Sequence, residues 1–233
     1  MTALAKAQGL LKRYRKGSEE IRPVNGLDVE IEEGELVAIR GPSGSGKSTL
    51  LNLLGGLDRP DAGSLTVAGA DLGKLTEAEL CRFRNLSIGF VFQVFHLIPV
   101  LSALENVELP LRLMSLSAKR RREQARLALE LVGLADRMTH RPDELSGGQQ
   151  QRVAIARAIA TDPKLLLADE PTGDLDERSG EEIMELFLAL NAQHKKTVVM
   201  VTHDSGKAAR ATRQLFFHEG KLVSKDPRAG VAA

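Results

Sequence analysis

The first candidate for chemistry lies at residues 41–48, which have the sequence GPSGSGKS and fit the phosphate-binding pattern G-x-x-x-x-G-K-[ST]. The apolar residues 36–40 before it predict a buried strand, and residues 49–54 after it predict a helix. In this context the glycines let the backbone take positive φ values and turn its N–H groups toward an anion at the positive end of the helix. The pattern therefore predicts a P-loop that binds a polyphosphate. The residues expected to bind nucleotide here are Gly41, Ser43, Gly44, Ser45, Gly46, Lys47, Ser48 and Thr49.

Two side chains of this loop have individual roles. We expect the Lys47 ammonium to reach the β- and γ-phosphates and the Ser48 hydroxyl to bind Mg²⁺. The structural alternative is a plain glycine turn between a strand and a helix, and the motif alone is shared by many nucleotide-using families. The strand and the helix on either side favour the P-loop over that alternative.

Polar side chains also stand where three further buried strands are predicted to end, namely Gln93, the pair Asp169 and Glu170, and His203. Ligands bind at the carboxyl ends of the strands in an α/β sheet, so these residues are expected near the P-loop. Hydrolysis of a β–γ phosphate bond requires charge neutralisation and an oriented water. We expect Asp169 to hold Mg²⁺ beside Ser48, and Glu170 to act as the general base on that water. We expect Gln93 to contact both the ion and the water, and His203 to hydrogen-bond the γ-phosphate.

Tyr14 is the only tyrosine of the chain, which contains no tryptophan. Taken alone, it is expected to pack against a sheet. Because it lies shortly before the strand that leads into the P-loop, it is also a candidate for stacking on an adenine ring.

A second phosphate-binding segment is predicted at residues 145–152, LSGGQQQR, which begin a helix. Ser146 is a good N-cap, and Gly147 and Gly148 behind it expose backbone N–H groups at the positive helix end. Capping alone does not require these two glycines, because glycine in a first turn costs stability. A self-contained ATPase does not need a second site of this kind.

The elements that must position these residues follow from periodicity. Alternating apolar residues predict a half-buried strand over 27–31, and helical spacing predicts helices over 118–132 and 181–190. The expected α/β core is interrupted by a helical insertion at residues 94–157. The side chains expected on apolar helix faces are Leu127, Leu131 and Leu134 in the first helix, Ile183, Phe187 and Leu190 in the second, and Val153, Ile155, Ala156 and Ile159 after residue 152.

Composition limits the class of protein. A chain of 233 residues with a net charge of +1 can bury a core and has no overall attraction for nucleic acid. Residues 119–122, KRRR, are expected to form a solvated helix face balanced by Glu123 and Glu130, so no nucleic-acid partner is expected. Cys81, the single cysteine, is expected to be buried. No signal peptide and no membrane span are expected, and the tail after Ser224 is expected to be loose.

The whole set resembles the ATP-binding subunits of ABC transporters, and it occurs in the order found in that family. The resemblance extends from about residue 8 to 223. It implies a P-loop NTPase with a RecA-like α/β core, an N-terminal antiparallel β subdomain and an inserted helical subdomain, all in one domain over 1–233. The core would comprise 1–93 and 158–233, and the insertion 94–157. Tyr14 matches the adenine-stacking A-loop, 41–48 the Walker A motif, Gln93 the Q-loop, 145–149 the signature, 165–170 the Walker B motif with its catalytic glutamate, Asp176 the D-loop and His203 the H-loop.

The resemblance also implies partners. Two such subunits pair head-to-tail, so Ser146, Gly147, Gly148 and Gln149 of one would close on ATP and Mg²⁺ held by the P-loop of the other. Integral membrane permease subunits would dock near the Q-loop at residues 93–110, which places the chain at the cytoplasmic side of the cell membrane. The apolar residues expected either to contact the permease or to belong to the helical core are Phe95, Leu97, Ile98 and Leu101.

Residues 53–58, 103–110 and 168–173 resemble the LolD/MacB/YbbA branch, whose members serve lipoprotein release or export of drugs, peptides and lipid-like molecules. Membrane partners in that branch have few spans and a large extracytoplasmic domain. Asp174 departs from the asparagine common there. Two alternatives remain open at this point: an ABC ATPase acting on DNA or ribosomes, and an ATP-dependent regulator of a membrane complex such as a cell-division assembly. The first usually carries coiled-coil insertions or a second ATPase unit, which this chain lacks.

Overall fold

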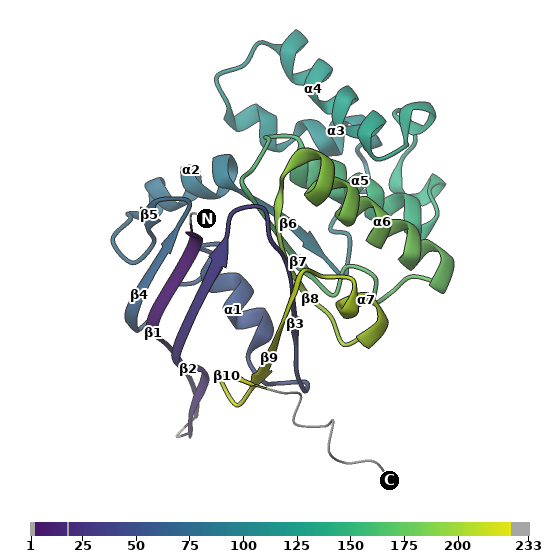
Figure 1. Ribbon diagram of the computed structural model, residues 1–233. Coiled ribbons are helices and arrows are strands. Elements are labelled where there is room, and N and C mark those ends of the chain that lie inside the picture. Colours follow the sequence, from purple (N-terminus) through teal and green to yellow (C-terminus); the bar gives the residue numbers. More distant parts are fainter. Residues whose placement is uncertain (1–2, 18, 225–233) are drawn as a thin grey trace.

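The computed structural model describes residues 3–17 and 19–224, arranged as two sheets with helices between and around them (Figure 1). One sheet is antiparallel, with the order β2-β1-β4-β5, and the other has six strands in the order β10-β9-β3-β8-β7-β6. The antiparallel sheet consists of β1 (Ala3–Lys16), β2 (Glu19–Glu32), β4 (Ala62–Val67) and β5 (Ala70–Asp71). The α/β class with an N-terminal antiparallel sheet is confirmed.

The six-stranded sheet is parallel except for the pairing of β9 with β10. Its interior strands are continuously apolar because both faces are covered. Along β7, Leu165 and Leu167 pack into one core cluster, while Leu166 and Ala168 pack into the other. The strands are β3 (Leu36–Arg40), β6 (Ile88–Phe92), β7 (Leu165–Asp169), β8 (Thr197–Val201), β9 (Arg213–His218) and β10 (Lys221–Val223).

Helices cover both faces of the parallel sheet (Figure 1). Helix α1 fills the space between the two sheets, while α5 and α6 cover the opposite face of the parallel sheet. The helices are α1 (Lys47–Leu54), α2 (Glu77–Ser87), α3 (Ala103–Glu108), α4 (Ala118–Leu131), α5 (Gly147–Ile159), α6 (Glu177–His194) and α7 (Ser205–Ala209), with 3₁₀ turns η1 (Pro110–Leu113), η2 (Ala135–Arg137) and η3 (Pro142–Glu144).

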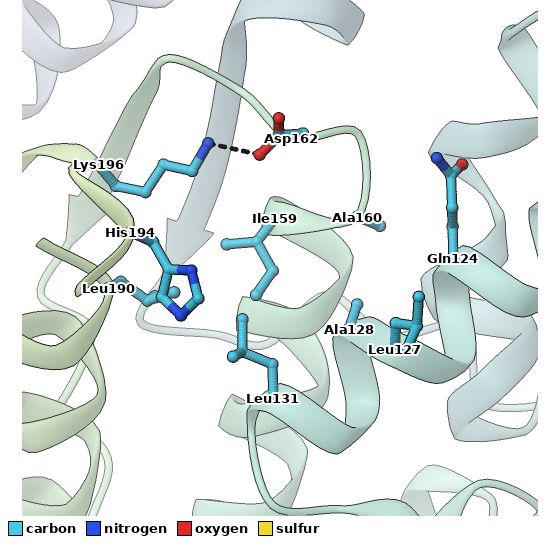
Figure 2. Close-up of a pocket in the computed structure, with 10 residues that line it drawn as sticks. All are labelled: Gln124, Leu127, Ala128, Leu131, Ile159, Ala160, Asp162, Leu190, His194 and Lys196. Atoms are coloured by element: carbon cyan, nitrogen blue, oxygen red, sulfur yellow. Dashed lines mark hydrogen bonds and ion pairs between the residues drawn. The ribbon is translucent and has the colours of Figure 1, made fainter.

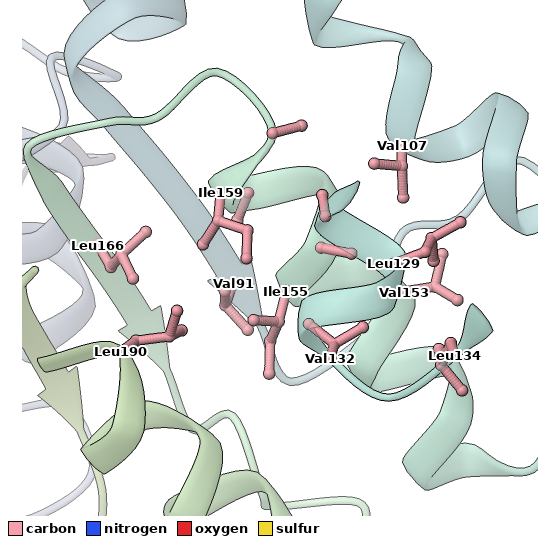
Figure 3. Close-up of a cluster of buried hydrophobic side chains, with 14 of the residues drawn as sticks. Val91, Val107, Leu129, Val132, Leu134, Val153, Ile155, Ile159, Leu166 and Leu190 are labelled. Atoms are coloured by element: carbon pink, nitrogen blue, oxygen red, sulfur yellow. The ribbon is translucent and has the colours of Figure 1, made fainter. Parts of the chain in front are cut away.

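Helix α5 connects the helical part of the chain to the sheet. Its predicted apolar side is confirmed, since Val153 packs toward α3 and α4 while Ile155 and Ile159 pack toward Val91 and Leu166 of the sheet (Figure 3). The predicted face of α6 is likewise buried. The proposed division of the chain at residues 93 and 157 stays a prediction, and its second boundary falls inside α5.

The apolar face predicted for residues 118–134 is confirmed at Leu134, which is buried just beyond α4, but is wrong within α4 itself. Leu127 and Leu131 are exposed, and the buried side chains of the helix are Ala125, Ala128 and Leu129. Two apolar stripes overlap in this helix, and the one with small alanines is buried because it permits close packing of α4 on its neighbours. Leu127 and Leu131 instead border a hollow of about 470 Å³ between α4 and the ends of α5 and α6 (Figure 2).

Three further expectations need correction or qualification. Cys81 is exposed rather than buried, because α2 is a surface helix whose inner side is formed by Leu80 and Phe83. Glu123 and Glu130 both form ion pairs with Arg126, and Glu123 also interacts electrostatically with Lys119 of the basic run at residues 119–122. The tail beyond Ser224 lies outside the described residues. Within the described part of the chain, no helix is long and apolar enough to cross a membrane.

Candidate nucleotide site

The P-loop has the backbone that its glycines predict. Gly41, Gly44 and Gly46 all have positive φ values, of 154°, 74° and 108°. Two of these glycines also allow close packing, because a Cβ on Gly41 would lie 2.0 Å from the carbonyl oxygen of Phe217 and one on Gly46 would lie 1.8 Å from that of Pro23. Gly46 is the N-cap of α1, and no side chain of the described residues caps this helix. The first-turn N–H groups therefore lie at the loop without a competing side-chain acceptor.

Lys47 extends back along the same loop. Its Nζ donates to the carbonyl oxygens of Gly41 at 3.0 Å and of Pro42 at 2.8 Å. Both acceptors belong to the loop that would surround a phosphate, so the ammonium is held at the entrance to that loop.

The carboxyl ends of β3, β6, β7 and β8 meet around one cleft of about 600 Å³. Adjacent parallel strands end at the same edge of the sheet, which brings together residues that are far apart in sequence. The cleft contains seven of the eight predicted P-loop residues, Ser45 being the exception. Its lining residues are Pro23, Gly41, Ser43, Gly44, Gly46, Lys47, Ser48, Thr49, Gln93, Asp169, Glu170, Val201 and His203.

Glu170 and His203 form a direct pair across this cleft. The Nδ1 atom of His203 lies 2.9 Å from Oε2 of Glu170, and the backbone N–H of His203 donates to the same oxygen at 3.4 Å. Glu170 has a φ of +46°, which is sparsely populated for a residue with a side chain. The carboxylate is mostly buried while the imidazole is mostly exposed, so the glutamate is the fixed member of the pair.

Gln93 is held by Asp174, a residue that the sequence motifs did not assign to the site. Its Nε2 donates to Oδ1 of Asp174 at 2.6 Å. A Cβ on Gly173 would lie only 3.0 Å from the Gln93 side chain, so the glycine leaves room for this contact. Asp174, the position at which the sequence departs from the branch it resembles, is therefore a direct hydrogen-bond partner of Gln93.

The residues proposed to hold Mg²⁺ have suitable chemistry. Ser48, Gln93 and Asp169 supply hydroxyl, amide and carboxylate oxygens around one cleft, and Mg²⁺ prefers oxygen ligands. The described residues include no group of three or more His, Cys, Asp or Glu side chains that would hold a metal by themselves. In nucleotide sites, Mg²⁺ is generally bound by one or two carboxylates together with substrate phosphates and water.

Tyr14 lies beside the cleft rather than in its lining. The residue is 41% exposed, its hydroxyl donates to Oδ2 of Asp58, and the Lys12 ammonium lies 5.1 Å from the ring centroid. Burial, together with the Asp58 carboxylate, raises the pKa of Tyr14 to about 12, while the side chain of Thr49 acts in the opposite direction. An exposed ring fixed at its hydroxyl end is suited to stacking, and the adenine role stays a proposal.

We expect Tyr14 to remain un-ionised at pH 10, where an ordinary tyrosine is about half ionised. A raised pKa means that the folded chain favours the neutral phenol, so this contribution to stability is complete below about pH 10 and is lost as pH rises through about 12. With one tyrosine and no tryptophan, phenolate absorbance reports this residue alone. Asp58→Asn should lower the midpoint toward that of the unfolded chain, and an unchanged midpoint would rule out the Asp58 contact.

The signature segment does not line the cleft of its own chain. Ser146 is exposed and forms a capping box with Gln149, in which its Oγ accepts from the Gln149 N–H at 3.3 Å and the Gln149 Oε1 accepts from the Ser146 N–H at 3.0 Å. Gly148 has a packing role that the sequence did not predict, since a Cβ there would lie 2.9 Å from Oγ of Ser179 in α6. Gly147 meets only ordinary contacts.

Sequence reasoning missed Asp174, Pro23 and Gln151 near this site. Asp174 follows residues 168–173 and Gln151 lies just after the signature, so position beside a recognised motif was the available signal for these two residues, and Pro23 had no such signal. The contacts that place them at the site come from other parts of the chain.

A P-loop that shares one cleft with a carboxylate pair, a glutamine and a histidine at neighbouring strand ends defines a P-loop nucleoside triphosphatase. The model of the ABC transporter family matches residues 24–173. The chain belongs to this family, and it is an ATP-binding and ATP-hydrolysing subunit of an ABC transporter.

Relatives match along nearly the whole chain. The chain is 50% identical to YvrO of Bacillus subtilis (strain 168), an uncharacterized ABC transporter ATP-binding protein, over 91% of this chain and 92% of that protein. It is 47% identical to the lipoprotein-releasing system ATP-binding protein LolD of Legionella pneumophila (strain Paris), over 94% of this chain and 97% of LolD. It is also 47% identical to the macrolide export ATP-binding/permease protein MacB 1/2 of Paracoccus denitrificans (strain Pd 1222), covering 99% of this chain but 34% of MacB.

Solved structures agree. A dimeric, post-hydrolysis structure of the ATP-binding cassette MJ0796 bound to ADP and Pi is similar with a TM-score of 0.86 and 45% identity, over 94% of this chain and 96% of that one. The fold class and the resemblance to ABC ATPases expected from the sequence are therefore confirmed.

Proposed function

We propose that two copies of this chain, or this chain and a similar ATPase subunit, pair head-to-tail on ATP and Mg²⁺. The observation that supports this pairing is the separation of the two phosphate-binding segments within one chain. The signature N-terminus, Ser146 to Gln149, lies outside the cleft that holds the P-loop, Gln93 and Glu170. A second copy would bring its signature over this cleft, as the dimeric state of the MJ0796 cassette suggests.

In this arrangement the residues have the roles expected from the sequence. Glu170 would polarise the attacking water, and His203, held by Glu170, would donate to the γ-phosphate. Mg²⁺ would be held by Ser48, Asp169 and Gln93, and would neutralise the charge between the phosphates.

We further propose that closure of the pair drives separate membrane permease subunits, in lipoprotein release or in export of drug, peptide or lipid-like substrates. LolD and MacB, by their names, serve lipoprotein release and macrolide export. The permease would have a large extracytoplasmic domain, and this chain would bind peripherally at the cytoplasmic side of the membrane.

We assign the docking surface for a permease to a groove, which we call the docking groove. It consists of two adjoining hollows of about 530 and 500 Å³ that share Cys81, Asn85 and Leu113. The groove lies where α2, β6, η1 and the end of α5 meet. Its rim exposes large apolar side chains, with Leu113 73% and Leu86 53% exposed, and apolar exposure of this kind marks an interaction surface.

Of residues 93–110, His96 and Pro110 line this groove, and several apolar residues of the segment are exposed outside it. Val94 and Val100 are 59% and 74% exposed, and Ile98 is 41% exposed. Leu97 packs against the helical core cluster instead. Leu97 therefore belongs to the helical core, and the exposed Ile98 is the better candidate for a permease contact.

The position of Cys81 allows a direct test, because it is the only thiol of the chain and lines both hollows. We expect a photo-crosslinker attached to Cys81 to join the chain to an integral membrane protein in membranes of the source organism. Mass spectrometry of the product would identify a protein with few spans and a large extracytoplasmic domain.

The matched control moves the thiol to Glu19, an exposed residue at the β1–β2 hairpin, which lies away from α2 (Figure 1). The double variant Cys81→Ser, Glu19→Cys should give little of this product. Equal cross-linking from both positions, or none from Cys81, would refute the docking groove.

A further inference from the structure

Gln151 is a buried polar side chain that the site described above does not use. It lies in α5, two residues after the signature, and its exposed fraction is 0%. Its Nε2 donates to the carbonyl oxygen of Phe92 at 3.1 Å and to that of Pro171 at 2.6 Å. Its Oε1 is buried and has no hydrogen-bond donor within the described part of the chain. Only the donating end of the amide is therefore satisfied.

The two acceptors belong to the two catalytic loops. Phe92 immediately precedes Gln93, and Pro171 immediately follows Glu170. Phe92 and Asp169 are also partners in the parallel pairing of β6 with β7, so a single amide group spans the point where both strands end. A buried polar group is costly unless it is hydrogen-bonded, so an apolar side chain would be the simpler choice for packing alone.

The same helix carries the signature. Gln151 lies five residues after Ser146, which corresponds to about 7.5 Å along a rigid helix. The capping box of Ser146 with Gln149 fixes the first turn of that helix. A displacement of the signature end of α5 would therefore be transmitted through Gln151 and would shift the carbonyl groups beside Gln93 and Glu170.

We propose that Gln151 is a positioning residue that couples the signature helix to the catalytic loops of its own subunit. The inference rests on the proposed head-to-tail pairing, in which the signature covers the ATP of the partner subunit. Closure over one nucleotide then adjusts Gln93 and Glu170 at the other, and the two sites hydrolyse ATP cooperatively. Gln151 itself does not contact nucleotide.

The test is Gln151→Met, which keeps the length and volume of the side chain but removes both donors. We expect kcat to fall about tenfold and the Hill coefficient to fall toward 1. Without the two buried hydrogen bonds, the backbone beside Gln93 and Glu170 is no longer held in the geometry that hydrolysis requires. The KM for ATP should change less than about twofold, and ATP-dependent pairing in a Glu170→Gln background should persist. The control is Gln124→Met, since Gln124 is an exposed residue of α4 that lies outside both the cleft and the signature.

A second variant distinguishes a loss of coupling from a loss of folding. Gln151→Glu has the same shape but places a carboxylate against two carbonyl groups, which raises the pKa of that carboxyl group. Its rate relative to wild type should rise as pH falls from about 8 to about 6, because the protonated acid recovers one donor.

The outcomes separate the two proposals. Wild-type kcat and cooperativity in Gln151→Met would overturn the coupling role. The coupling role would also be overturned if Gln151→Met lost ATP binding and folding together and the rate of Gln151→Glu did not rise at lower pH. A wild-type protein that neither pairs on ATP nor hydrolyses it cooperatively would overturn the proposed pairing itself.

Discussion

Glu170→Gln is expected to lower the rate of ATP hydrolysis at least about 100-fold while ATP binding is retained. The amide preserves the shape of the side chain but cannot accept a proton from water. It also loses the carboxylate that pairs with Nδ1 of His203 at 2.9 Å. Because hydrolysis is what reopens the proposed pair, this variant should accumulate as a dimer in ATP and Mg²⁺.

Steady-state phosphate release and size-exclusion chromatography with and without ATP measure these two effects. The matched control is Glu185→Gln, which removes an exposed carboxylate on α6 that pairs with Arg210 at the end of α7. A surface ion pair contributes about 1 kcal/mol or less, so this control should hydrolyse ATP at the wild-type rate. A Glu170→Gln protein with wild-type turnover would remove Glu170 as the general base.

Ser146→Arg is expected to abolish cooperative ATP hydrolysis without unfolding the protein. Ser146 is exposed and belongs to the segment proposed to close on the ATP of the partner subunit. An arginine there adds a long side chain at the closing surface and removes the cap of α5. Loss of a capping hydroxyl costs about 1 kcal/mol, which a folded domain tolerates. Nucleotide binding to the P-loop of the single chain should remain.

Ser117→Arg is the control for the capping part of this effect. Ser117 caps α4 through the Arg120 N–H and lies outside both the cleft and the signature. Its replacement should lower the unfolding temperature about as much as Ser146→Arg but leave hydrolysis and ATP-dependent pairing near wild type. If Ser146→Arg still hydrolysed ATP cooperatively, the proposal that the signature acts on the partner's nucleotide would be wrong.

The sequence by itself determined the local elements of the site. The glycines of residues 41–48 specify a loop with positive φ, and Gly41, Gly44 and Gly46 adopt it. Continuous apolar runs identified the strands that lead to Gln93, Asp169 and His203, because strands buried on both faces are predominantly apolar. Parallel strands end at one edge of a sheet, so these motifs together were sufficient to predict one cleft.

Only the tertiary structure decided how neighbouring elements contact one another. The partner of Gln93 lies 81 residues away at Asp174, and the carbonyl groups held by Gln151 lie 59 and 20 residues away. Periodicity reports which side of an element is apolar, but not which of two overlapping stripes is buried, and for this reason the prediction for Leu127 and Leu131 was wrong. Local pattern fixes strands, caps and loops, whereas these contacts depend on sheet register and on how closely helices pack.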